Sequence, residues 1–274
     1  MKRKGFTIIE LMLAMGFLGT LLVTIALLVT MITGIYQKGL SLRAVNANGK
    51  QIIDDMTRII SGSPMPGVSL NPTPDISGEI TNTAIHDALK QYFVTTVKEG
   101  QQLHGAFCTG SFSYIWNTQP SYSSEEGLLR IEFPENSSSP LDNPHTPKFA
   151  RIPDSTRSVC RTLADPGKVS ISGVTTIEAT GTPIELINND ESDLILYDFV
   201  VFPATQNDTT SQIFYSVTFI LATLRGGVNI LSNGDYCDVN SGHSVSGLSH
   251  DFNYCAVNKF NFAIRATGYT EAGN

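Results

Sequence analysis

The sequence predicts an α+β protein, in which a long N-terminal helix packs on an antiparallel β-sheet head whose loops are tied by disulfides. Three observations support this prediction. The segment 11–37 carries no charged side chain, and an apolar stripe of helical period follows it. Short runs rich in β-branched and aromatic residues then dominate the chain after residue 110.

The first half of the predicted helix is long enough to cross a membrane. The uncharged run from Leu11 to Gln37 exceeds the roughly 20 apolar residues that a transmembrane helix needs. A cleaved secretory signal fits poorly, because its apolar core covers only about 7–15 residues. Lys2, Arg3 and Lys4 precede the run, and basic residues flank a span on its cytoplasmic side. We therefore expect a single-pass membrane protein with a cytoplasmic N-terminus.

Glu10 is the one acidic residue within this apolar N-terminal region. A carboxylate at membrane depth costs about 3 kcal/mol, so such a residue is normally paired or functional. A plain membrane anchor gives no reason for it. Because the segment 11–37 offers no cation, the partner of Glu10 must be Lys4 or Arg3, a neighbouring chain, or an amine newly formed by cleavage.

The stretch KRKGFTIIELMLAM at 2–15 resembles the signal of type IV prepilins and type II secretion pseudopilins. In that family a membrane-bound prepilin peptidase cuts after the glycine and methylates the new N-terminal residue; the matching residues are Gly5 and Phe6. The family's glutamate, fifth in the mature chain, matches Glu10. The resemblance implies that Glu10 neutralises the N-terminal amine of a neighbouring filament subunit. A buried ion pair is costly to break, so this pair would set the axial register.

An amphipathic continuation of the helix is predicted over 37–62. The apolar stripe consists of Leu42, Val45, Gly49, Ile52, Met56 and Ile59, and the charged residues off the stripe are Lys50, Asp54, Asp55 and Arg58. The stripe should cover a face of the head. The sequence SGSPMPG at 61–67 ends the helix. From Phe6 to Ile60 the helix would be about 80 Å long.

The resemblance also favours a minor subunit. Family members often carry a proline eight residues after the position of Gly19, and Leu27 stands there instead. The stretch 34–63 is similar to the J-type minor pseudopilin and to PilW-like minor pilins. The resemblance implies the divisions 1–5 (cleaved leader), 6–36 (transmembrane and filament-core helix), 37–62 (amphipathic helix) and 63–274 (extracytoplasmic head).

The same resemblance implies where the protein acts and with what. Its partners would be the prepilin peptidase, other pilin or pseudopilin subunits and an inner-membrane assembly platform. The protein would reside in the membrane before assembly, and afterwards in a cell-surface pilus or a periplasmic pseudopilus.

The head is expected to be β-rich. Strands are predicted at 112–117, 128–133, 194–202, 213–224 and 259–266, with a hairpin over 171–186 and a short helix over 79–92. The last strand alternates, with Phe260, Phe262 and Ile264 on one face and Lys259, Asn261 and Arg265 on the other. Long polar surface loops are expected at 134–155 and 232–255.

Four cysteines, Cys108, Cys160, Cys237 and Cys255, favour two disulfides in an exported chain. Three pairings are open. We favour Cys237–Cys255, which brackets the loop 232–255 and resembles the disulfide-bounded C-terminal region of many type IV pilins, together with Cys108–Cys160. Four free buried thiols are the alternative.

No catalytic, cofactor or metal site is expected, and the protein is predicted not to be an enzyme. The histidines form no HExxH motif, the loop with His243 and His250 is interpreted as solvated, and 188–193 lacks the EF-hand spacing for calcium. The formal net charge of −7 argues against nucleic-acid binding. The modest basic cluster consists of Arg151, Arg157, Arg161 and Lys168. The alternatives are a tip adhesin or DNA-uptake pilin, and a membrane-tethered extracytoplasmic enzyme.

Overall fold

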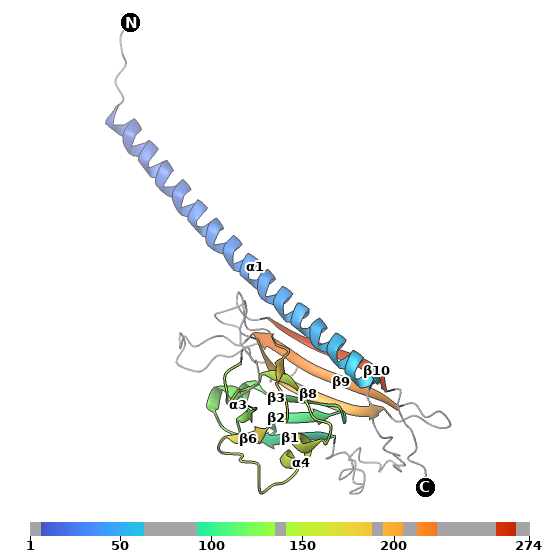
Figure 1. Ribbon diagram of the computed structural model, residues 1–274. Helices are drawn as coiled ribbons and strands as arrows, with labels where there is room; N and C mark the ends of the chain where they lie inside the picture. The colour runs from blue at the N-terminus through green and yellow to red at the C-terminus, as the bar shows by residue number, and fades with distance from the viewer. Residues whose placement is uncertain are drawn as a thin grey trace, which may run out of the picture.

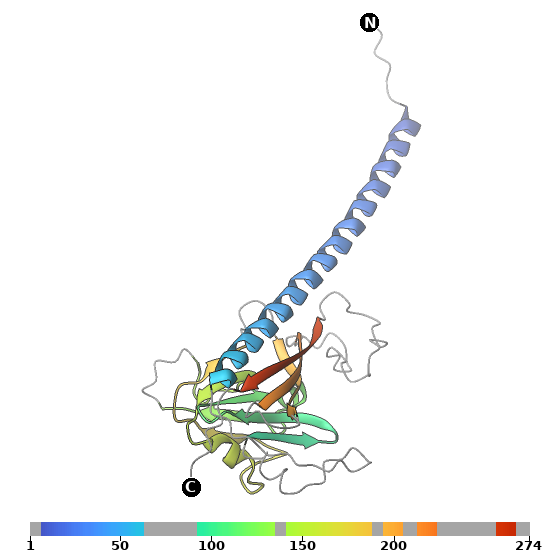
Figure 2. The ribbon, with the colours of Figure 1, turned by 90° about the vertical axis from the view of Figure 1, so that its right-hand side faces the viewer.

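The computed structural model describes residues 7–62, 92–134, 141–187, 194–204, 213–223 and 256–266. One long helix, α1 (Ile8–Gly62), stands at a slant on a β-rich head and projects far beyond it (Figure 1). Only the C-terminal part of α1 lies against the head, as the second view also shows (Figure 2). This α+β arrangement agrees with the predicted fold class.

The helix α1 has 55 residues and ends at Gly62, where the sequence predicted its end. The expected stripe is largely confirmed, because Val45, Gly49, Ile52 and Met56 are buried. The stripe differs at its two ends. Leu42 is exposed, and Ile60 is fully buried in place of Ile59, which is half-buried. The helix therefore turns its buried face slightly as it crosses the head.

The head contains three sheets in the described residues. The five-stranded antiparallel sheet has the order β1 (Phe93–Lys98), β2 (Gln101–Cys108), β3 (Phe112–Asn117), β5 (Phe149–Pro153) and β7 (Ile184–Glu185). The three-stranded antiparallel sheet has the order β10 (Val257–Ala266), β9 (Ile213–Thr223) and β8 (Leu194–Ala204). The two-stranded sheet pairs β4 (Leu129–Glu132) with β6 (Thr175–Glu178) in parallel, which the antiparallel prediction did not include.

The five predicted strands are confirmed as β3, β4, β8, β9 and β10, but two other predictions for the head are wrong. The segment 134–155, expected as a surface loop, contains β5, whose Phe149, Ala150 and Ile152 are fully buried. The hairpin expected over 171–186 does not form. Its strand β6 pairs with β4, and its strand β7 pairs with β5. Strands β1 and β2 were not predicted.

The main core lies between the three-stranded sheet, the five-stranded sheet and α1. Trp116 is its centre, with its ring centroid 4.5 Å from that of Phe199 and 6.1 Å from that of Phe149. The aromatic chain continues through Phe219 to Phe260, whose ring centroids are 4.8 Å apart beneath α1. A second buried cluster lies around Ile115, Ile131, Val159 and Cys160. The head therefore buries both faces of the five-stranded sheet.

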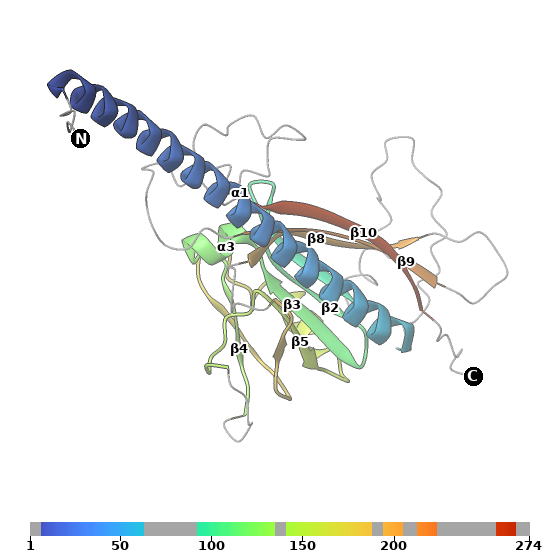
Figure 3. The same cartoon turned by 90° about the horizontal axis from the view of Figure 1, so that it is seen from above.

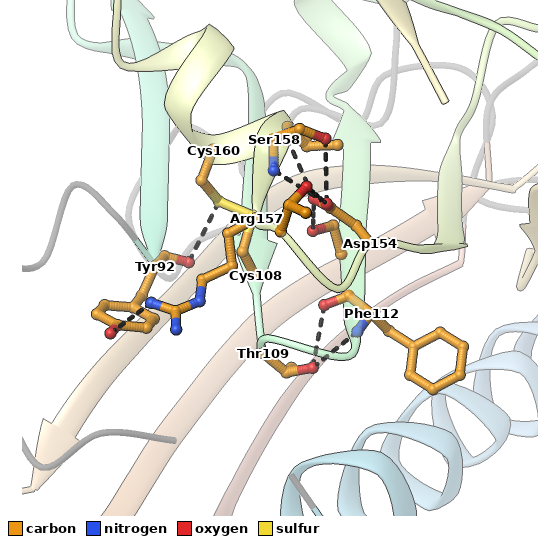
Figure 4. The surroundings of a disulfide bond; sticks show 11 residues. Tyr92, Cys108, Thr109, Phe112, Asp154, Arg157, Ser158 and Cys160 are labelled. Carbon is orange, nitrogen blue, oxygen red and sulfur yellow. Dashed lines mark hydrogen bonds between the residues drawn. A yellow bond between two sulfur atoms is a disulfide. The ribbon is translucent and has the colours of Figure 1, made fainter. Parts of the chain in front are cut away.

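The expected disulfide between Cys108 and Cys160 is present and joins the end of β2 to the helix α4 (Ser158–Leu163) (Figure 4). The two cysteines are 52 residues apart, so the chain-entropy model gives the bond about 4 kcal/mol. Cys237 and Cys255 lie outside the described residues, as do the loop 232–255 and almost all of the short helix expected over 79–92.

Asp154 fixes α4 beside this disulfide (Figure 4). Its carboxylate accepts hydrogen bonds from the backbone N–H of Ser158 and Val159, at 2.9 and 3.1 Å, and from the Ser113 hydroxyl at 2.8 Å. Burial raises the pKa of Asp154, but these hydrogen bonds outweigh it and the net shift is downward. The charged carboxylate therefore supplies the N-terminal partners that α4 lacks.

Candidate assembly helix

The N-terminal half of α1 is an apolar rod that the head does not cover. Every residue from Ile8 to Thr33 is exposed, and the large apolar side chains from Ile8 to Tyr36 are 44% to 80% exposed. By length and composition, α1 is the one helix in the described residues that can cross a membrane. An exposed apolar surface of this length is costly in water, so it requires a lipid or protein environment.

The polar side chains of this rod satisfy their own hydrogen bonds. The hydroxyls of Thr20, Thr24 and Thr30 donate to backbone carbonyls three residues earlier, at 2.8 to 2.9 Å. Thr33 donates to the carbonyl of Val29 at 2.8 Å. A threonine bonded in this way presents mainly its methyl group to the surroundings. These four residues are therefore compatible with a hydrocarbon environment.

Glu10 caps the N-terminus of α1. Its Oε2 accepts hydrogen bonds from the backbone N–H and from the hydroxyl of Thr7, both at 2.9 Å. In return the Thr7 hydroxyl oxygen accepts from the backbone N–H of Glu10, at 3.3 Å. This is a capping box, which satisfies two of the free donors at a helix start. The sequence pattern Thr-x-x-Glu at 7–10 could have predicted it.

A glycine lets the lower half of α1 approach the head closely. Gly49 faces the ring of Phe260 on β10, and a Cβ built on Gly49 would lie 2.2 Å from the ring atom Cζ. Nearby, Nδ2 of Asn258 donates to Oδ1 of Asn46 at 2.7 Å. Gly49 therefore serves the contact with the three-stranded sheet, whereas Gly16 and Gly19 have no atom within 4 Å of such a Cβ.

An ion pair joins the same half of α1 to the five-stranded sheet. Asp55 pairs with Arg151 of β5, and each side chain is only 10% exposed. The hydroxyl of Tyr114 donates to Oδ2 of Asp55 at 3.0 Å, and burial together with the Asp55 charge raises the pKa of Tyr114. Asp55 therefore lies off the apolar stripe, as predicted, but its carboxylate faces the head and bonds Arg151 and Tyr114.

Two of the four residues of the predicted basic cluster contact other side chains of the protein. Arg151 is buried against Asp55, and Arg157 stacks on the ring of Tyr92 and donates to its hydroxyl at 2.6 Å. Arg161 and Lys168 remain exposed. Two of the four cations are thus held by protein contacts, so the cluster is not a continuous basic surface.

Several predicted site residues lie outside the described residues, namely Gly5, Phe6, Cys237 and Cys255. The segments weighed and rejected as metal sites, 188–193 and the loop with His243 and His250, also lie outside them. Within the described ranges, no group of three or more His, Cys, Asp or Glu side chains has a geometry that could hold a metal ion.

Comparison of the chain with family models, with curated proteins and with solved structures found no match in any of the three.

Proposed function

We propose that this protein is a structural subunit, a minor pilin or pseudopilin, of a type IV pilus-like filament. Prepilin peptidase would cut after Gly5 and methylate Phe6. The observation that carries the proposal is the basic leader, the glycine and Glu10 at family spacing in the sequence. Glu10 lies in the first turn of a continuous helix whose first half is apolar and uncovered. No catalytic role is proposed for the chain.

The exposed apolar surface of this rod suits both the membrane before assembly and the helix bundle of a filament afterwards. Before assembly, the segment 8–36 lies in the membrane, with the basic leader in the cytoplasm. After extraction by an assembly platform, the same side chains pack against the helices of neighbouring subunits in a filament. The head remains outside the membrane throughout, fixed to α1 by the Gly49 contact and the Asp55–Arg151 pair.

The capping box indicates how Glu10 can serve both states. Thr7 bonds Oε2 of Glu10, and within the described residues the second carboxylate oxygen has no hydrogen-bond partner. In the filament that oxygen accepts the N-terminal amine of a neighbouring subunit. The helix start is thus held by Thr7, while the charge of Glu10 is available for assembly.

Cleavage is tested by co-expressing the chain with a prepilin peptidase and measuring the intact mass. Gly5→Ala should abolish processing, whereas the control Gly16→Ala, a glycine in open space further along the helix, should be cleaved normally. A mature-size product from Gly5→Ala would refute the leader assignment.

Assembly is tested with two variants that distinguish the hydrogen bonds between Glu10 and Thr7 from the negative charge of Glu10. Glu10→Gln keeps an oxygen that accepts from Thr7 but removes the charge, and Glu10→Val removes both. Both variants should be cleaved and should be poorly incorporated into sheared filaments. Normal incorporation of Glu10→Gln would show that the charge has no role in register.

A further inference from the structure

The outer strand of the three-stranded sheet, β10, has an edge that no other described strand pairs with, here called the free edge. It pairs with β9 through ten consecutive residue pairs, from Val257 with Ala222 to Ala266 with Ile213, without a bulge. Figure 3 shows β10 at the margin of this sheet, and α1 packs on the face of β10 that carries Phe260. In the described part of the chain, β9 is the one strand that pairs with β10. Ten regular residues of backbone are therefore presented at this edge.

The register identifies which backbone groups point outward. The N–H of Thr223 donates to the carbonyl of Ala256 at 3.0 Å, so this is a hydrogen-bonded pair of the antiparallel ladder. Such pairs alternate along the strands, so even-numbered residues of β10 bond to β9. The N–H and C=O groups that face the free edge belong to Val257, Lys259, Asn261, Ala263 and Arg265. The side chains of the same five residues are exposed.

The other edge strands of the two antiparallel sheets are irregular, clamped or short, which distinguishes β10 from them. Strand β8 has a register shift between Leu196 and Asp198, and the Gln102 amide bonds both the N–H and the C=O of Phe199, at 2.9 and 3.0 Å. Strand β1 also has a register shift, and β7 has only two residues. Bulges, side chains that bond the backbone of the edge strand, and short strand length all hinder strand addition. The strand β10 has none of these three features in the described residues.

The charges on β10 indicate what kind of strand fits. Lys259 and Arg265 are its only ionisable side chains, and both are basic and exposed although the whole chain has a net charge of −7. Opposite charges directly across two strands are favourable. Phe260 and Phe262 on the inner face are only half-buried, so an added strand would also cover apolar area.

The same charges disfavour a second copy of this chain. Two β10 strands can pair antiparallel over most of their length with the centre at Asn261 or at Phe262. With the centre at Phe262, Lys259 of one copy lies directly opposite Arg265 of the other. With the centre at Asn261, Lys259 and the other copy's Arg265 are diagonal neighbours. Like charges at these positions are destabilising. The preferred occupant is therefore a different strand that carries acidic residues.

We propose that the free edge of β10 binds an extended acidic segment of a partner protein by strand addition, with carboxylates facing Lys259 and Arg265. Because these residues are six positions apart, the two carboxylates would also be six positions apart on the partner strand. Main-chain hydrogen bonds to the odd-numbered residues supply the affinity, and the two ion pairs supply the selectivity. The proposal depends on the sheet alone and does not require the filament assignment.

The probe is a synthetic peptide of alternating valine and threonine, as long as β10, with two glutamates six positions apart. The matched control peptide has lysines at both positions. Binding is measured on the full chain in detergent micelles by fluorescence anisotropy, and amide hydrogen exchange over 257–266 reports where the peptide binds. We expect the glutamate peptide to bind roughly tenfold more tightly than the lysine peptide and to slow exchange in β10.

Two variants make the test specific. Ala263→Pro removes an outward N–H without removing a bond to β9, so it should abolish peptide binding, while Ala263→Thr should keep it. The double change Lys259→Glu with Arg265→Glu should invert the preference between the two peptides. Equal binding of both peptides, no binding of either, or binding unaffected by Ala263→Pro would overturn the proposal. Self-association of the chain that Ala263→Pro abolishes would also overturn it, because a second copy would then be the occupant.

Discussion

Single polar side chains replace missing backbone partners at several points in the head. The Asn117 amide accepts from the N–H of Leu129 at 2.8 Å and donates to its carbonyl at 2.9 Å. Gln102 bonds the backbone of Phe199 in the same two-sided manner. Each amide therefore acts as one extra residue of a β-ladder where two segments cannot pair directly. Such residues are structural, although buried amides can resemble parts of an active site.

His104 is the buried ionisable group from which we predict a pH effect on stability. Its Nδ1 donates to the carbonyl of Gly127 at 2.5 Å, so its Nε2 accepts from the Thr96 hydroxyl at 2.9 Å. Burial lowers the pKa of His104, and the hydrogen bond to Gly127 only partly opposes this shift. The folded protein therefore holds this imidazole neutral.

As the pH is lowered, His104 takes up a proton in the unfolded chain before it does so in the folded protein. The free energy of unfolding should therefore fall as the pH drops through about 6.5. The contribution of His104 reaches at most about 1.4 kcal/mol per pH unit, down to its folded pKa. His104→Gln should lack this contribution. Urea unfolding between about pH 8 and pH 5 measures it, and an unchanged pH slope in the variant would contradict the assignment.

The Asp55–Arg151 pair should be important for the stability of the helix–head contact. Arg151→Met leaves the mostly buried Asp55 carboxylate without its buried cation, which should cost about 3 kcal/mol of unfolding free energy. Arg58 is also bonded to Asp55, at 3.2 Å, but its side chain is 72% exposed. Arg58→Met is therefore the matched control and should cost less than about 1 kcal/mol.

Combining Asp55→Asn with Arg151→Met should cost less than the sum of the single changes, because no unpaired buried charge remains. The free energy of unfolding of the four proteins, measured in denaturant, gives the coupling. If Arg151→Met were as mild as Arg58→Met, the ion pair would not be important for stability.

At the scale of elements, the contact between α1 and β10 is set by the absence of one side chain. Gly49→Ala would place a methyl group inside the ring of Phe260, which should cost about 2 kcal/mol through overpacking. Gly39→Ala is the control, because Gly39 is helical and has no atom within 4 Å of the added Cβ. That change should stabilise the protein by up to about 1 kcal/mol through helix propensity.

Thermal unfolding of both variants tests this contact. Adding Phe260→Leu to Gly49→Ala should recover part of the lost stability, since the smaller side chain makes room for the methyl group. Equal effects of the two glycine substitutions would show that the helix does not need the close approach.

At the scale of the whole molecule, the two halves of α1 should be separable. Residues 8–33 are exposed throughout, so a chain beginning at Gly34 should unfold within about 1 kcal/mol of the full protein. A chain beginning at Gly49 also loses Val45, which is fully buried, and the Asn46–Asn258 bond. It should be destabilised by more than about 2 kcal/mol.

Urea unfolding of the two truncated chains, compared with the full chain in detergent, measures this difference. Equal stability of the two truncations would contradict the division of α1 into an uncovered rod and a packed half.

The sequence by itself determined the features that depend on local period. The length and end of α1, most of its buried stripe and the alternation of Phe260, Phe262 and Ile264 in β10 were all predicted, because a helix or strand repeats within a few residues. The Cys108–Cys160 bond was also favoured in advance, although its position at the start of α4 was not. The capping box of Thr7 and Glu10 was present in the sequence and was missed.

Only the tertiary structure decided which segments become neighbours. The residues FARIP of β5 follow a polar, proline-rich stretch and include an arginine, so they resemble a loop until two neighbouring strands and Asp55 surround them. The pairing of β6 with β4, and not with β7, depends in the same way on contacts between distant residues. Burial and strand pairing depend on what lies across the core, and that information is not contained in the period of any single segment.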